Sequence, residues 1–219
     1  GSVLLGKLNL SELAMGGTQN PPWGIPANPW NFECSPGESS SGSGVALAAH
    51  LCAASMGEDT GGSGRGPASY CGVVGLRPTF TRVSRFGMTH MCWFMDAAAP
   101  MTKTVEDCAV MLGVIAGYDE KDPYTSHKPV PDYTAGMRDG VKGLRVGLIK
   151  ELHQTLDMHP DVRSAIEASL DTLRELGAGV KEVSIPLADL AGAIFVGIAD
   201  TEGAGARDEI LRNQPSDLD

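Results

Sequence analysis

Hydrophobic residues in the last third of the chain alternate with polar ones in two short runs that flank an amphipathic segment. The alternating runs are residues 144–148 and 183–185. Between them, apolar residues recur at helical spacing from Pro160 to a stop at Gly177. The pattern predicts a β-α-β unit, which is typical of an α/β sheet covered by helices on both faces.

Three further elements are predicted from apolar patterning. Residues 104–116 form a helix with one apolar face, a capping-box pair of Thr104 and Asp107, and Gly117 as its stop. The compact apolar stretch Val45–Ala49 predicts a buried helix, and Cys71–Leu76 predicts a short buried strand that ends before Pro78.

Composition narrows the class of protein. The 219 residues include 17 basic and 27 acidic side chains, a net charge of −10, with a pI near 4.9. Such an acidic chain is a poor candidate for tracking a phosphate backbone, so we expect no nucleic-acid partner. No charged leader opens the chain, and the longest strongly apolar run, Leu190–Ala199, is too short to span a bilayer. We therefore expect no membrane insertion.

Cysteine usage indicates a reducing compartment. The five cysteines form no CxxC pair, and their number is odd, so neither a zinc ribbon nor a disulfide framework is predicted. Several have apolar neighbours, such as Leu51 beside Cys52, which favours buried, reduced thiols. The five histidines are scattered without metal-binding spacing. We expect a cytoplasmic protein that needs no metal or organic cofactor.

Two segments rich in glycine and serine, residues 37–44 and 59–67, carry the candidate chemistry. Composition alone would favour flexible linkers. However, each segment adjoins an element that should be buried, and a loop held against core elements is more often a shaped site. The chain lacks the P-loop GxxxxGK[ST], the GxSxG elbow of α/β-hydrolases and the SxxK of β-lactamases.

The order of these segments resembles the amidase-signature family. Pro36-Gly37-Glu38-Ser39-Ser40-Ser41-Gly42-Ser43 is followed by Asp59-Thr60-Gly61-Gly62-Ser63-Gly64-Arg65-Gly66-Pro67, and Ser39 and Ser63 lie 24 positions apart, as in that family. Flanking segments that agree with it are Gly6–Asn9, Met15-Gly16, Asn28–Trp30, Cys71–Thr79, Arg82–Arg85 and Pro100–Asp107. The resemblance runs from about Leu5 to Ile185.

The resemblance implies an α/β amidase-signature fold, a mixed sheet flanked by helices on both faces, and a Ser–cis-Ser–Lys hydrolase of small-molecule amides. Ser63 would be the nucleophile, and Ser39, preceded by a cis peptide bond, would pass a proton between Ser63 and a neutral lysine. Thr60, Gly61 and Gly62 would form the oxyanion hole. Met15 would line the substrate site, although core filling explains it equally well.

The resemblance also implies that parts of the catalytic machinery lie outside this sequence. The family's lysine lies in a stretch that precedes the first residue here, and its sheet continues beyond the last. Lys7, in the Gly6–Asn9 motif, is expected to be structural. We therefore expect one amidase-signature domain over residues 1–219 that is incomplete at both ends relative to the family.

Three residues depart from the family pattern. Glu38 and Ser41 replace glycines of the first motif, and Gly64 replaces an apolar residue after the nucleophile. Arg65 could either bind an acidic substrate or hold the glycine loop through backbone bonds, and we favour the second role.

Several alternatives remain at this stage. A Ser-His-Asp triad is spatial, so spacing does not exclude it, and Cys71 is a weaker candidate nucleophile. Within the family, a component of an amidotransferase that releases ammonia from glutamine for a partner is an alternative to a free-standing amidase. A scaffold that retains the motifs without catalysis is another. Self-association is left open.

Overall fold

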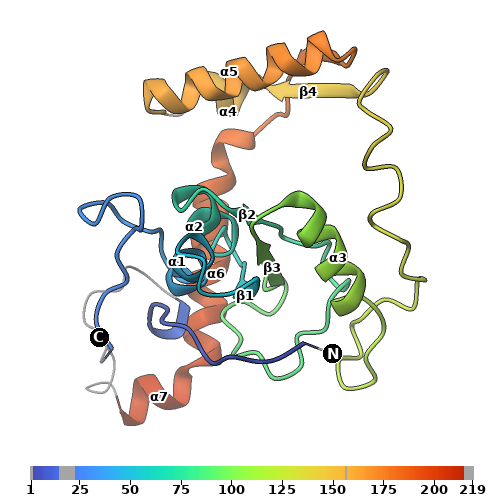
Figure 1. Ribbon diagram of the computed structural model, residues 1–219. Helices are drawn as coiled ribbons and strands as arrows, with labels where there is room; N and C mark the ends of the chain where they lie inside the picture. The colour runs from blue at the N-terminus through green and yellow to red at the C-terminus, as the bar shows by residue number, and fades with distance from the viewer. Residues whose placement is uncertain (1, 15–22, 156, 215–219) are drawn as a thin grey trace. The chain divides into compact units, whose positions relative to one another are not determined.

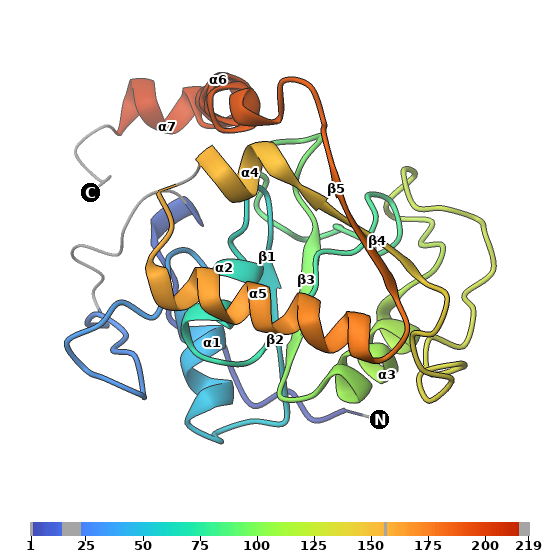
Figure 2. The ribbon, with the colours of Figure 1, turned by 90° about the horizontal axis from the view of Figure 1, so that it is seen from above.

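The structure is a computed structural model that describes residues 2–14, 23–155 and 157–214. Its strands are β1 (Ala54–Glu58), β2 (Val74–Gly75), β3 (Ala98–Thr102), β4 (Arg145–Ile149) and β5 (Gly179–Val183). Its helices are α1 (Ser41–Ala48), α2 (Arg65–Tyr70), α3 (Val105–Ile115), α4 (Lys150–Thr155), α5 (Pro160–Glu175), α6 (Ala191–Ala206) and α7 (Asp208–Asn213), with short 3-10 turns at Glu12–Ala14 and Ala188–Leu190. Figures 1 and 2 show these elements from two directions.

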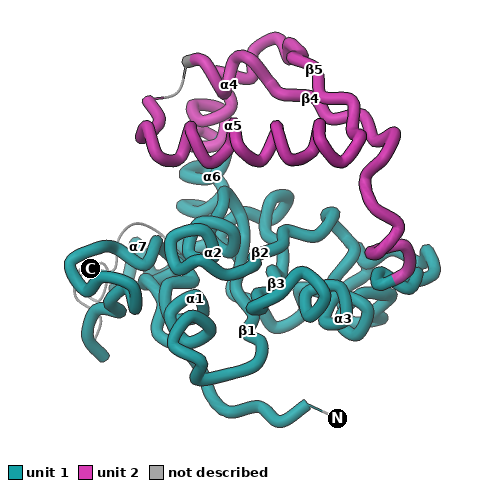
Figure 3. Tube along the Cα trace, turned by 45° about the horizontal axis from the view of Figure 1, so that its top comes forward, with its two compact units in different colours: residues 1–134, 198–219 teal, residues 135–197 magenta. Residues whose placement is uncertain are grey.

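The chain divides into two compact units, coloured separately in Figure 3. The first contains residues 1–134 and 198–219, and the second contains residues 135–197. The prediction of a single domain over residues 1–219 is not decided by this division and stays a prediction.

An antiparallel sheet in the order β1-β3-β2 organises the first unit. All five residues of β3 are buried, because helices cover both of its faces. On one face Met101 packs with Leu47 of α1 and Ala68 of α2, and on the other Ala98 packs with Leu112 of α3. Successive side chains of a strand point to opposite faces, so β3 contributes to both clusters. Figure 1 shows α1 and α2 on one side of this sheet and α3 on the other.

The second unit contains the predicted β-α-β pattern. Strands β4 and β5 are parallel, with Arg145 opposite Gly179 and Ile149 opposite Val183. The intervening α5 begins at Pro160, which suits the first turn of a helix because proline lacks an amide donor. It packs against β5, and Leu170 is its buried residue. The prediction for this part of the chain is confirmed.

The other sequence predictions have mixed outcomes. The helix at residues 104–116 is confirmed as α3, whose N-cap Thr104 accepts a hydrogen bond from the Asp107 amide. The buried helix expected at Val45–Ala49 is α1, which begins earlier, at Ser41. The strand expected at Cys71–Leu76 is wrong in extent: Cys71 caps α2, and only Val74 and Gly75 pair with β3.

All five cysteines are unpaired. Cys71, Cys92 and Cys108 are buried, whereas Cys34 is exposed, so the expectation of buried thiols fails there. Within the described residues, no helix is both long enough and apolar enough to cross a membrane.

Candidate active site

Ser63 lies in the turn between β1 and α2, and its hydroxyl donates a hydrogen bond of 2.8 Å to the Oγ of Ser39. Ser39 is buried in the segment that leads into α1. Because α1 packs against β1 and α2, the two glycine- and serine-rich segments meet. The structure therefore brings together the two serines that the sequence singled out.

The hydroxyl of Ser39 in turn donates to the backbone carbonyl of Ala14, 3.2 Å away. The two hydrogen bonds form a chain from Ser63 through Ser39 to a carbonyl oxygen. A carbonyl accepts a hydrogen bond but is too weakly basic to take the proton at neutral pH. Within the described residues, the chain of hydroxyl groups thus ends without a base.

The backbone at Ser39 differs from the family expectation. Every peptide bond in the described residues is trans, so the implied cis bond before Ser39 is absent. Instead, Ser39 adopts a left-handed conformation with φ of 61°. A positive φ is uncommon for residues other than glycine, and it sets the direction of the Ser39 side chain at this turn.

The amide groups of the nucleophile candidate and of the three residues before it are unpaired within the described residues. The N–H groups of Thr60, Gly61, Gly62 and Ser63 donate to no acceptor within the described residues. Gly62 has φ of 136°, a conformation that side chains rarely adopt, so glycine is required there. Four available donors in consecutive residues are what an oxyanion hole needs.

Asp59 and Arg65 fix the ends of this loop. The Asp59 carboxylate, fully buried, accepts two hydrogen bonds from the Arg65 guanidinium, at 2.8 and 3.0 Å, and one from the Arg65 amide. The hydrogen bond to Asp59 raises the pKa of Arg65 further above its usual range. Arg65 therefore holds the glycine loop, which is the role favoured from the sequence. It does so mainly through its side chain, whereas backbone bonds were expected.

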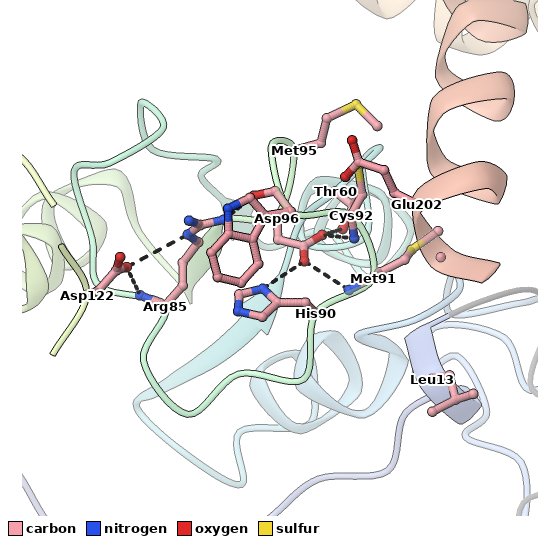
Figure 4. Close-up of polar contacts among 12 residues, drawn as sticks. Leu13, Thr60, Arg85, His90, Met91, Cys92, Met95, Asp96, Asp122 and Glu202 are labelled. Carbon is pink, nitrogen blue, oxygen red and sulfur yellow. Dashed lines mark hydrogen bonds and ion pairs between the residues drawn. The ribbon is translucent and has the colours of Figure 1, made fainter. Parts of the chain in front are cut away.

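Asp96 is a second buried anchor, and sequence reasoning missed it (Figure 4). Its carboxylate accepts hydrogen bonds from the Thr60 hydroxyl at 2.6 Å and from the amides of Met91 and Cys92, both at 2.9 Å. The Nδ1 of His90 lies 3.3 Å from this carboxylate, and the His90 ring contacts that of Trp93 at a tilt of 57°, with 4.3 Å between the ring centroids. A single acidic residue within the apolar run 91–101 was the available signal, because buried carboxylates are rare unless they are hydrogen-bonded.

Further polar contacts join β1 to the serine run, and another joins the end of α6 to the N-terminal segment. The Ser40 hydroxyl donates a hydrogen bond to the carbonyl of Glu58 and accepts one from the amide of the same residue. Burial, reinforced by the charge of Asp96 and opposed by that of Arg207, raises the pKa of Glu58 to about 7. Arg207 donates to the carbonyl of Leu13 at 2.9 Å, which ties the end of α6 to the N-terminal segment.

The remaining candidates are less informative. Met15 lies outside the described residues. Within the described residues, Ser63 makes no hydrogen bond to a histidine, and His90 pairs with Asp96 instead, so no Ser-His-Asp triad forms there. Burial raises the pKa of the Cys71 thiol, which disfavours the thiolate that a nucleophile needs. The described residues contain no cluster of three or more metal-ligating side chains.

Comparison with known sequences identifies relatives over nearly the whole chain. A glutamyl-tRNA(Gln) amidotransferase subunit from Geobacter sulfurreducens is 49% identical over 206 residues, 93% of this chain and 42% of that protein. The same subunit from Syntrophobacter fumaroxidans is 46% identical, with the same coverage. The chain thus spans less than half the length of the curated relatives that it matches.

Solved structures agree with this relationship. The corresponding subunit from Thermotoga maritima superposes with a TM-score of 0.87 at 38% identity, over 96% of this chain and 46% of that one. The native peptide amidase of Stenotrophomonas maltophilia gives 0.69 at 34% identity, over 84% and 39%. The predicted amidase-signature fold is confirmed. The family model described as Amidase matches residues 1–219, and the chain therefore belongs to the amidase family.

Proposed function

We propose that this chain carries the nucleophile of an amidase, with Ser63 attacking the carbonyl carbon of a carboxylic amide. The 2.8 Å hydrogen bond between Ser63 and Ser39 is the observation that supports this most directly. A serine hydroxyl is weakly nucleophilic at neutral pH, so a neighbouring group must take its proton during attack. Ser39 is the described group positioned to do so.

The reaction proceeds in two balanced steps. The Ser63 oxygen bonds to the carbonyl carbon, its proton passes to Ser39, and the proton of Ser39 passes to a base. That proton then reaches the departing nitrogen, so ammonia or an amine leaves and an acyl-Ser63 ester remains. Water, deprotonated through the same route, hydrolyses the ester and restores the serine. No redox or cofactor step is required.

The amide groups of Thr60, Gly61 and Gly62 would stabilise the oxyanion in both steps. They are unpaired within the described residues, and the buried anchors Asp59 and Asp96 hold the two ends of the loop that presents them. Removal of one oxyanion donor costs about 3 kcal/mol of transition-state stabilisation in comparable enzymes.

The base in this proposal is a neutral lysine supplied by polypeptide outside this sequence. The Ala14 carbonyl, which accepts a hydrogen bond from the Ser39 hydroxyl, would be exchanged for the lysine amine. Burial would depress the pKa of such a lysine enough for it to act as a base. The five unpaired cysteines support a reducing, cytoplasmic setting for the reaction.

A second candidate is favoured by the names of the relatives, which are amidotransferase subunits. In this version the amide is that of glutamine, and the ammonia is passed to a partner instead of being released. The predicted absence of a nucleic-acid partner then has no support, since the name of these relatives includes a transfer RNA. Glutaminase activity that rises when a partner protein is added would favour this version over a free-standing amidase.

Covalent labelling with a fluorophosphonate tests the proposal on the full-length polypeptide. We expect labelling at Ser63, its loss in Ser63→Ala, and a rate lower by roughly 100-fold in Ser39→Ala, the lower range for general-base contributions. Ser69→Ala, an exposed serine on α2, is the matched control and should label like the wild type. Labelling that survives Ser63→Ala would contradict the proposal, and an absence of labelling would favour a scaffold.

A further inference from the structure

The segment of residues 9–14 lies directly against the serine run. The Ser11 amide donates to the carbonyl of Ser39 at 3.2 Å, and the Gly42 amide donates to the carbonyl of Asn9 at 2.8 Å. The approach is so close that a Cβ atom at Gly42 would lie 2.2 Å from the carbonyl oxygen of Asn9. This segment therefore forms part of the immediate surroundings of Ser39.

Within this segment, the carbonyl of Ala14 sets the direction of the Ser39 hydroxyl. That hydroxyl donates to the Ala14 carbonyl at 3.2 Å and accepts the hydrogen bond of Ser63 at 2.8 Å. A hydroxyl has a single proton, so a proton directed at Ala14 leaves a lone pair of the Ser39 oxygen for Ser63. Attack by Ser63 needs this direction, because its proton must pass to Ser39. The position of one backbone carbonyl thus decides whether the two serines are oriented for proton transfer.

The backbone that presents this carbonyl has an uncommon conformation. Leu13 and Ala14 are both left-handed, with φ of 50° and 58°. Residues other than glycine seldom adopt this conformation, and it persists only where surrounding contacts hold it. The turn at Leu13 and Ala14 therefore needs a contact that holds its backbone in place.

Arg207, at the end of α6, supplies such a contact. It is 6% exposed, and its guanidinium donates to the carbonyl of Leu13 at 2.9 Å and to that of Gly203 at 3.2 Å. Arginine is seldom buried without partners, and its planar guanidinium presents several donors in a rigid geometry. Because Gly203 belongs to α6, Arg207 connects the turn to a helix.

The hydrogen bond from Arg207 acts on the part of the turn that matters for Ser39. The carbonyl of Leu13 and the amide of Ala14 belong to one planar peptide group. A donor that holds this carbonyl therefore restrains ψ of Leu13 and φ of Ala14 together. These two dihedral angles determine where the Ala14 carbonyl lies.

We infer that Arg207 is a positioning residue for the Ser63–Ser39 pair. It holds the peptide group before Ala14, the Ala14 carbonyl directs the Ser39 hydroxyl, and that hydroxyl receives the proton of Ser63. In this scheme the lysine amine lies beside the Ala14 carbonyl and accepts the Ser39 proton after a rotation of the O–H bond, while the turn stays in place. The catalytic part of the inference rests on the proposed function, whereas the placement of the turn does not.

Fluorophosphonate labelling of the full-length polypeptide at a series of reagent concentrations tests the catalytic part. In Arg207→Met the maximal rate of labelling at Ser63 should fall by about 10-fold or more, the equivalent of one hydrogen bond to a charged group. The half-saturating concentration should stay within about 2-fold of the wild-type value, because Arg207 acts through the turn and not on the bound reagent. An unchanged maximal rate would overturn the inference.

Two controls separate positioning from a general loss of stability. Arg212→Met changes an exposed arginine that pairs with Asp208 in α7, and it should label like the wild type. Thr104→Ala removes the cap of α3 and should also label like the wild type, although it is less stable. A rate in Thr104→Ala as low as that in Arg207→Met would show that stability alone sets the rate, and it would overturn the inference.

A second substitution at the same position tests the geometry of the guanidinium. Arg207→Lys keeps the positive charge but lacks the planar fork that reaches two carbonyls. Its maximal rate should lie between those of Arg207→Met and the wild type. A rate equal to that of the wild type would contradict the inference, and this comparison decides the matter even if Arg207→Met does not fold.

Hydrogen exchange, followed by mass spectrometry on the wild type and Arg207→Met, tests the placement of the turn without enzymatic activity. The amides of Ser11 and Ala14 donate to backbone carbonyls. In Arg207→Met, residues 9–14 should exchange about 10-fold faster or more, while α3 should be unaffected. Equal exchange of residues 9–14 in the two proteins would overturn the inference. A wild type that is not labelled at Ser63 would instead refute the proposed function, and this measurement would still decide whether Arg207 holds the turn.

Discussion

Thr60 and Asp96 anchor the first part of the glycine loop through a single hydrogen bond between their side chains. Thr60→Val keeps the shape of the side chain but removes one of the donors to a fully buried carboxylate. We expect it to lower the free energy of unfolding by about 1–3 kcal/mol, measured by urea denaturation. Thr60→Ser, which keeps the hydroxyl, should recover most of this loss. Equal stability of the valine variant and the wild type would contradict the anchoring role.

Glu58 gives the protein a stability that depends on pH. Its pKa is raised from 4.5 to about 7 in the fold, mainly by burial, so between these values the folded state holds a proton that the unfolded state has released. Stability therefore falls as pH rises through this window. Glu58→Gln has no carboxyl to titrate, so its free energy of unfolding should not fall in this way. Relative to the wild type, it should therefore rise by about 1–2 kcal/mol between pH 5 and pH 8. Thermal melts of both proteins at pH 5 and pH 8 measure this change. The same stability difference at both pH values would contradict the prediction.

At the scale of elements, those with a clear period or cap could be predicted from sequence. The helix α3 has a capping pair, and the β4–α5–β5 segment has alternating and helical runs. The strand β3 was missed because all five of its residues are buried and apolar or small, which leaves no alternation to detect. The helix α6 contains four glycines, which disfavour helices in isolation, so it was not predicted either.

The cap of α3 is itself a testable contribution to stability. Thr104 accepts the amide of Asp107 at 3.1 Å, and its hydroxyl donates to the Asp107 carboxylate at 2.8 Å. Thr104→Ala should lower the free energy of unfolding by about 1 kcal/mol. For a chain of this length the melting temperature should fall by about 2–4 °C. Thr104→Ser is the control that keeps the cap, and an alanine variant as stable as the serine variant would argue against it.

At the scale of the whole molecule, we expect residues 1–219 to unfold as one domain. Calorimetry should then show a single transition whose calorimetric and van't Hoff enthalpies agree. Two resolved transitions would instead indicate that the units 1–134 with 198–219, and 135–197, unfold separately.

The contacts of the candidate active site, which join residues from distant parts of the molecule, were predictable only in part. The pairing of Ser39 with Ser63 followed from the family motifs, whereas the contacts of Asp96 with Thr60 and of Arg207 with Leu13 did not. These partners lie 36 and 194 positions apart, and no local period encodes such distances.

Gly64 has a consequence for how the sequence can change. A Cβ atom at this position would lie 2.6 Å from the Cβ of Ala99 in β3, so the two positions share space for one side chain. Gly64→Ala alone should destabilise the protein, and Ala99→Gly alone should leave a small void. The double variant should be more stable than the sum of the single losses predicts, measured as a double-mutant cycle. The two positions are thus expected to evolve together: a side chain gained after the nucleophile becomes tolerable only once β3 has lost one, and the order of the two substitutions matters.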